Sequence, residues 1–145
     1  MTAIPKSALL LGLAGLLPFL ASTVAILVEQ PSFLAGLDQR IILHYGIIIL
    51  AFMSGVLWGF ATKAHGRAAT QGYILSVIPA LWAFFTTMGT TSQGLSTLIL
   101  GFLGLLGLDW HFWRSGLAPT WWMRLRLILS AVVLTCLAIA LMRTT

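Results

Sequence analysis

Charged residues are scarce in this sequence. Only 8% of the 145 residues are Asp, Glu, Lys or Arg, and 59% are hydrophobic, whereas soluble domains contain about 25% charged and about 45–50% apolar residues. So few charged side chains cannot cover a soluble fold with groups that water solvates well. The composition therefore excludes a soluble globular protein and predicts a chain that lies in a membrane.

The residues that usually carry chemistry are scarce as well. The single cysteine, Cys136, has no partner for an intramolecular disulfide, and we interpret it as a small apolar side chain. The sequence shows no Ser-His-Asp order, no glycine loop that would cradle a phosphate and no pair of cysteines. We therefore predict no catalytic residue, no metal site and no cofactor.

Long apolar segments account for most of the chain. Five of them contain no acidic residue and almost no basic residue, and each approaches the roughly 17–25 residues that cross a bilayer as a helix. We expect spans over residues 7–28, 41–62, 71–89, 91–108 and 125–142 of a single membrane domain, residues 1–145. The apolar run after Lys6 is longer than the core of a secretory signal peptide, so we expect a retained anchor. The predicted fold class is an all-α polytopic membrane bundle of five transmembrane helices.

The basic residues are unevenly distributed between the two ends of this predicted bundle. Six of the eight fall on the side of the N-terminus, and only Arg40 and Arg143 fall on the other side. Because basic loops resist translocation, we expect a bacterial inner-membrane protein with a cytoplasmic N-terminus and a periplasmic C-terminus. The alternative is a re-entrant hairpin in place of spans three and four, since the fourth span opens with polar residues. The charges lie at span ends, where lipid phosphates are the nearest counter-ions, so we expect the lipid bilayer as a partner and no nucleic acid.

Tryptophan and arginine are concentrated around the connection between the last two spans. Indoles prefer the headgroup region and guanidinium groups pair with phosphates, so we expect this segment to lie flat in the cytoplasmic interface. It is either an anchoring belt or a binding site for anionic phospholipid at Arg114, Arg124 and Arg126. The predicted lipid-interface residues are Trp110, Trp113, Arg114, Trp121, Trp122, Arg124 and Arg126.

Small residues and prolines indicate how the spans pack and bend. Ala51, Gly55 and Gly59 recur at a spacing of four, a pattern that allows close helix approach in lipid. We expect this strip to pack within the bundle, the alternative being a seam of a homo-oligomer. Pro18 and Pro79 each remove a helix hydrogen bond, so both positions predict helix kinks.

One polar cluster is conceivable at the inner face. There the predicted topology allows His65, Asp109 and His111 to converge, and two histidines with a carboxylate would suit a metal ion or a proton transfer. Their spacing matches no recognised ligand motif. Interfacial His and Asp side chains are more often solvated or paired with Arg, so we do not predict a metal site here.

Several motifs, in this order along the chain, resemble a known family. They lie at Leu11–Phe19, Tyr45–Gly59, Ser76–Leu81, Gly101–Asp109 and Trp121–Leu127. The sequence resembles the transmembrane protein 69 family, small five-span proteins that contain a domain of unknown function and occur in bacterial inner membranes and mitochondria. This resemblance implies a membrane bundle and no established activity.

Three functional hypotheses remain at this point. The first is a non-catalytic accessory or structural protein that binds lipid or another membrane protein, in a complex or as a homo-oligomer. The second is a small oligomeric carrier or channel whose path would be lined by Pro79, Trp82 and the polar start of span four. The third is a lipid- or quinone-linked membrane enzyme that would act through the cluster of His65, Asp109 and His111.

Overall fold

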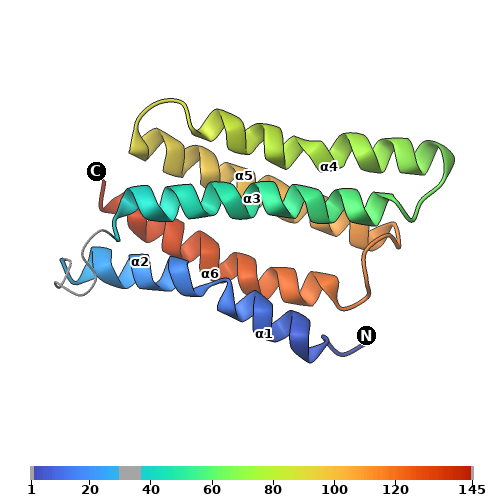
Figure 1. Ribbon diagram of the computed structural model, residues 1–145, viewed down its shortest axis with the longest axis horizontal. Coiled ribbons are helices and arrows are strands. Elements are labelled where there is room, and N and C mark those ends of the chain that lie inside the picture. Colours follow the sequence, from blue (N-terminus) through green and yellow to red (C-terminus); the bar gives the residue numbers. More distant parts are fainter. Residues whose placement is uncertain (1, 30–36, 145) are drawn as a thin grey trace.

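A computed structural model describes residues 2–29 and 37–144, which fold into helices joined by short connections (Figure 1). The helices are α1 (Lys6–Ala14), α2 (Leu17–Leu27), α3 (Gln39–Ala61), α4 (Gly66–Thr86), α5 (Thr91–Arg114) and α6 (Trp122–Met142). The first two together form one span of 22 residues, so the described part of the chain contains five segments long and apolar enough to cross a membrane. The predicted all-α, five-span membrane fold is therefore confirmed.

The helix α3 lies at the centre of the bundle, where it contacts α2, α4, α5 and α6 (Figure 1). Its fully buried residues Ile42, Leu50 and Leu57 recur at intervals that place them on one side of a helix. Phe52, on another face of the same helix, is 65% exposed. A helix that is apolar on every face suits a bundle whose outer surface meets hydrocarbon rather than water.

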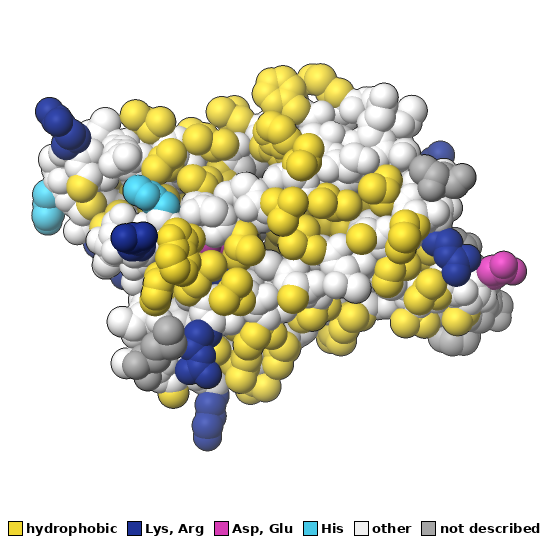
Figure 2. Space-filling view, turned by 180° about the vertical axis from the view of Figure 1, so that it is seen from behind, with side chains coloured by type: hydrophobic (Ala, Val, Ile, Leu, Met, Phe, Trp, Pro, Cys, Tyr) yellow, Lys and Arg dark blue, Asp and Glu magenta, His cyan; other side chains and the backbone are white. Residues whose placement is uncertain are grey.

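The outer surface has the distribution of side chains that a membrane requires. Hydrophobic side chains cover the middle of the face shown in Figure 2, and Lys, Arg and His side chains lie at the two ends. Both α4 and α5, with 21 and 24 residues, are long enough to span. The structure therefore favours two complete crossings over a re-entrant hairpin for this pair.

The first span is interrupted close to Pro18. Helix α1 ends at Ala14 and α2 begins at Leu17, so that Pro18 occupies the first turn of α2. Proline is tolerated in a first turn because the N–H groups there have no partner within the helix. In the break, the carbonyl of Gly15 accepts a hydrogen bond of 2.8 Å from Tyr45 Oη of α3.

Pro79 lies inside α4, and a side chain from α3 forms hydrogen bonds with the backbone beside it. The Ser54 hydroxyl donates a hydrogen bond to the carbonyl of Ser76 and accepts one from the N–H of Ala80 at 3.2 Å. The Ser76 hydroxyl itself donates to the carbonyl of Tyr73. A polar side chain from the neighbouring helix therefore bridges the backbone of α4 next to the proline, as is common in membrane helices.

This arrangement gives a first prediction about stability. Replacing Ser54 with Ala is expected to lower the free energy of unfolding by about 1–2 kcal/mol, because buried backbone groups of α4 lose their partner. The matched control is Ser96→Ala on α5, where an exposed hydroxyl donates only within its own helix, to Ser92. Equilibrium unfolding in mixed micelles should show a clear loss for Ser54→Ala and little change for the control. Equal effects would contradict the bridging role.

The small-residue strip of α3 does not pack inside the bundle, contrary to our expectation. Ala51, Gly55 and Gly59 are all exposed, and nothing lies within 4 Å of a Cβ atom placed at either glycine. The close approaches occur at other glycines, since a Cβ at Gly72 would lie 2.9 Å from the Cβ of Ala61. Spacing alone indicated close packing, whereas the buried side of α3 is set by its large residues. The strip remains a candidate seam between copies.

Candidate functional site: a buried ion pair between the last two helices

The helices α5 and α6 form a hairpin that brings their polar residues together. Gly116, with a φ of +77°, lies in the short connection, and Leu117 and Ala118 both donate their N–H groups to the carbonyl of Phe112. Trp113 Nε1 donates to the carbonyl of Thr120 at 3.0 Å. These bonds provide donors for backbone carbonyl groups at the end of α5 and in the connection, and they fix the register in which α6 packs against α5.

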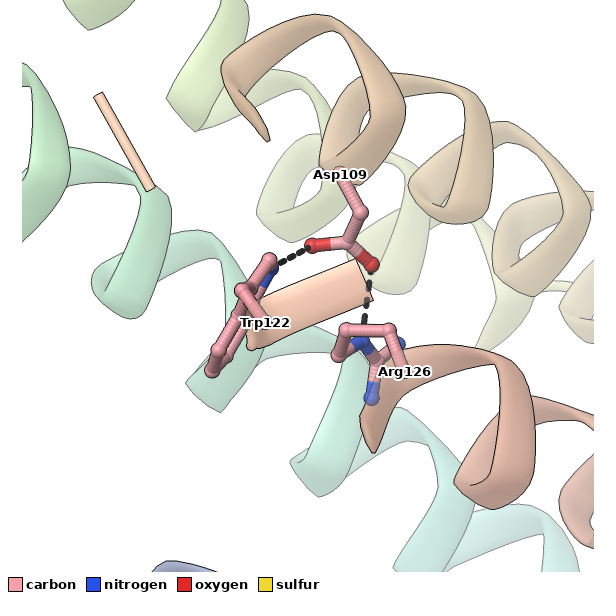
Figure 3. Close-up of polar contacts among 3 residues, drawn as sticks. All are labelled: Asp109, Trp122 and Arg126. Carbon is pink, nitrogen blue, oxygen red and sulfur yellow. Dashed lines mark hydrogen bonds and ion pairs between the residues drawn. The ribbon is translucent and has the colours of Figure 1, made fainter. Parts of the chain in front are cut away.

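A salt bridge joins the two helices within the bundle (Figure 3). Arg126 Nε donates to Asp109 Oδ2 at 2.7 Å, and Trp122 Nε1 donates to Asp109 Oδ1 at 2.9 Å. The side chain of Asp109 is 0% exposed and that of Arg126 only 5%. Both carboxylate oxygens thus have a donor, which is the condition under which a buried charge can be retained.

Aromatic rings complete the surroundings of this pair. The guanidinium carbon of Arg126 lies 6.0 Å from the ring centroid of Trp122, and Phe60 of α3 meets the Trp122 ring edge-on at 5.0 Å. Trp122 and Arg126 are four residues apart and share one side of α6. The cluster therefore links α5 to α6 and packs against α3.

The arrangement has one chemical property that the sequence did not show. Asp109 and Arg126 are the only charged residues that are buried in the described part of the chain, and their charges cancel. Arg126 has further N–H groups, and its Nη2 is buried without a hydrogen-bond partner among the described residues. The site thus combines an internally neutral ion pair with a donor that is free to meet an acceptor.

The predicted lipid-interface residues are separated by the structure. Arg126 and Trp122 are buried, so neither faces lipid headgroups as we expected, because each is a partner of Asp109. Trp110, Arg114 and Arg124 are exposed. Trp113 and Trp121 are partly buried. The predicted interfacial loop is also shorter, because residues 109–114 continue α5 and residues 122–126 begin α6.

The predicted cluster of His65, Asp109 and His111 does not form. Both histidines are exposed, while Asp109 points into the bundle. Asp109 and His111 are two residues apart on α5, a spacing that directs side chains to different sides of a helix. Within residues 2–29 and 37–144, no group of three or more His, Cys, Asp or Glu side chains is placed to hold a metal ion.

Two features of the sequence could have indicated this ion pair. Asp109 is the only acidic residue near the basic end of the bundle, and Trp122, Arg126 and Ser130 recur at a spacing of four. A lone carboxylate beside a helix with polar residues on one face is typical of an intramembrane ion pair. We expected Arg126 among the interfacial residues and predicted no role for Ser130.

Five apolar segments around a buried, paired charge define a multi-pass helical membrane protein. Within that class, the chain belongs to a family described as protein of unknown function (DUF3429), which matches residues 4–142. The predicted family resemblance is therefore confirmed.

Two relatives carry the name Transmembrane protein 69. The relative from Xenopus tropicalis is 33% identical over 134 residues, which cover 88% of this chain and 51% of the relative. The relative from Mus musculus is 29% identical over 144 residues, which cover 94% of this chain and 56% of the relative. The chain thus spans about half the length of these relatives. No solved structure matches it.

Proposed function

We propose that this protein is a non-catalytic accessory component of the bacterial inner membrane, and that its basic end binds anionic phospholipid. The observation that carries this proposal is the charge at that end of the bundle. Five basic side chains are exposed there, namely Lys6, Lys63, Arg67, Arg114 and Arg124. The only acidic residue nearby, Asp109, is buried and paired.

The opposite end carries a different balance of charge. Arg40 and Arg143 are exposed there together with Glu29, and Asp38 caps α3 by accepting hydrogen bonds from two backbone N–H groups. In Figure 2, Lys, Arg and His side chains lie at one end, and at the other end an acidic side chain lies beside Lys or Arg side chains. The charge distribution therefore supports a single anionic-lipid surface and, by the positive-inside rule, a cytoplasmic N-terminus.

The aromatic residues support the same surface. Trp110 is 48% exposed on the last turns of α5, and its ring lies 5.3 Å from that of the partly buried Trp113. Indole rings at a span end favour the headgroup region, where Arg114 and Arg124 can reach lipid phosphates.

The described residues contain no buried Asp, Glu, Lys, Arg or His other than the paired Asp109 and Arg126, which supports a non-catalytic role. The buried charges neutralise each other, and both histidines of the basic end are exposed. The carrier hypothesis gains no support either, because Pro79 and Trp82 line a groove between α4 and α5 that opens on the outside of the bundle.

The lipid proposal predicts a selective loss of lipid binding. Near an anionic surface each Lys or Arg contributes about 1 kcal/mol, so Arg114→Gln/Arg124→Gln is expected to weaken the preference for phosphatidylglycerol by up to about 30-fold. The measurement is the immobilised fraction of spin-labelled phosphatidylglycerol in vesicles that contain an excess of phosphatidylcholine.

The matched control is Arg40→Gln/Arg143→Gln, which removes two exposed charges from the opposite end. Both double variants should melt at the temperature of the original protein. An unchanged preference in the first variant, or an equal loss in both, would refute the anionic-lipid surface.

A further inference from the structure

A cavity of about 140 Å³ lies among α1, α2, α3, α5 and α6. Its inner wall is formed by buried apolar side chains, among them Phe19, Met53 and Phe102. Two polar residues of α6, Arg126 and Ser130, also line it. The cavity is therefore an apolar chamber with a polar patch on one helix.

The polar patch consists of donors without partners. Three buried side-chain atoms of the described chain have no hydrogen-bond partner, and two of them, Arg126 Nη2 and Ser130 Oγ, belong to residues of this cavity. Arg126 is 4% exposed and Ser130 is 2% exposed. They are four residues apart, so both side chains lie on the same side of α6. Buried donors are normally paired, which makes two unpaired ones in the same cavity an indication of a ligand.

The cavity is accessible from the hydrocarbon side. Leu11 of α1 and Phe52 of α3 line it and are 74% and 65% exposed. Helix α1 buries none of its residues, and it contributes Gly12 to the wall. A molecule dissolved in the bilayer can therefore enter between α1 and α3 and leave an apolar tail in the lipid.

The charge at the patch restricts what can bind. Asp109 already neutralises Arg126, so a carboxylate or phosphate would add an uncompensated negative charge to a buried site. A guanidinium N–H can only donate, and a hydroxyl can donate as well, so the ligand must present an acceptor. A neutral carbonyl oxygen meets both conditions.

The size of the cavity restricts the ligand further. An apolar cavity of roughly 150 Å³ accommodates benzene. The chamber here, at about 140 Å³, therefore has room for one six-membered ring or a short length of acyl chain.

We propose that this cavity binds the carbonyl-bearing end of a neutral amphiphile taken from the bilayer, with Arg126 Nη2 and Ser130 Oγ donating to the carbonyl oxygen. An isoprenoid quinone and a neutral acylglycerol both have this chemistry. The site is separate from the anionic-lipid surface, because Arg114 and Arg124 do not line the cavity.

The test uses two probes with ¹³C-labelled carbonyl groups, decylubiquinone and dioctanoylglycerol, added to the full chain in nanodiscs. Isotope-edited infrared spectra should show a carbonyl band at lower frequency than the same probe gives in empty nanodiscs, because hydrogen bonding weakens the C=O bond. Ser130→Ala is expected to raise the Kd about fivefold to tenfold, since it removes one hydrogen bond. Ser130→Leu, which also fills the cavity, is expected to abolish the shifted band.

The control is Gly104→Leu. Gly104 lines the groove between α4 and α5, where nothing lies within 4 Å of an added Cβ atom, so this variant should bind both probes normally. If only decylubiquinone gives a shifted band that depends on Ser130, the site binds a quinone. If only dioctanoylglycerol gives such a band, the site binds an acylglycerol. If neither probe gives a band that depends on Ser130, the proposal is wrong. The spin-label experiment on Arg114 and Arg124 would be unaffected by that outcome.

Discussion

Replacing Asp109 with Leu is expected to lower the free energy of unfolding by about 3–5 kcal/mol, because Arg126 would remain buried without its counter-ion. Arg126→Met should lower the free energy of unfolding by a similar amount, because the carboxylate of Asp109 would then accept a hydrogen bond from Trp122 alone. Each single variant thus isolates one charge in a site that water does not reach.

The double variant Asp109→Leu/Arg126→Met distinguishes a buried charge from a lost contact. It should be more stable than either single variant, because no uncompensated charge remains and apolar side chains fill the same space. Trp122 Nε1 still lacks its acceptor in the double variant, which leaves a residual cost of about 1–3 kcal/mol.

The control for this cycle is Arg124→Met, which replaces an exposed arginine two residues before Arg126 on α6. We expect it to change the free energy of unfolding by no more than about 0.5 kcal/mol. Equilibrium unfolding in mixed micelles measures all four variants. If Asp109→Leu lowered the free energy of unfolding no more than Arg124→Met does, the ion pair would not stabilise the fold as described. The same conclusion would follow if the loss in the double variant equalled the sum of the losses in the two single variants.

Hydropathy along the sequence predicted the ends of some helices but not of others. The predicted second span, residues 41–62, agrees with α3 (Gln39–Ala61) to within two residues at each end. The fourth agrees at its start but continues to Arg114 rather than residue 108. Hydropathy ended this span at the first polar residue, whereas the helix continues because Asp109 is neutralised by a partner on the next helix.

The candidate site was not predictable in the same way. Which arginine pairs with Asp109 depends on the register of the hairpin, and only the spacing of four from Trp122 to Arg126 and Ser130 distinguishes Arg126 from the exposed Arg124. The cavity depends on five helices at once and on side chains that are distant in sequence, such as Leu11 and Ser130. A sequence read segment by segment shows which residues are polar but not which of them face each other.

The second large effect is expected at Gly72, where α4 crosses α3. A Cβ atom at this position would lie 2.9 Å from the Cβ and 3.5 Å from the Cα of Ala61, which is fully buried. Because a neighbouring backbone cannot move aside as a side chain can, Gly72→Leu is expected to lower the free energy of unfolding by about 3 kcal/mol.

The matched variant is Gly55→Leu in the small-residue strip of α3, where nothing lies within 4 Å of an added Cβ atom. Leu is a better helix former than Gly by somewhat less than the roughly 0.8–1 kcal/mol that separates Gly from Ala, so this variant should equal or exceed the original protein in stability. Unfolding in mixed micelles gives both values, and a loss at Gly55 equal to that at Gly72 would contradict the described packing of α3 on α4.

The same pair of variants tests the strip as a seam between copies. If Ala51, Gly55 and Gly59 meet a second copy, Gly55→Leu should shift the mass measured by light scattering in detergent toward the monomer without loss of helix content. Gly72→Leu should instead reduce the unfolding midpoint and leave the mass of the folded fraction unchanged. An unaltered mass for Gly55→Leu would mean that the strip faces lipid alone, where its small side chains leave α3 open to the acyl chains around it.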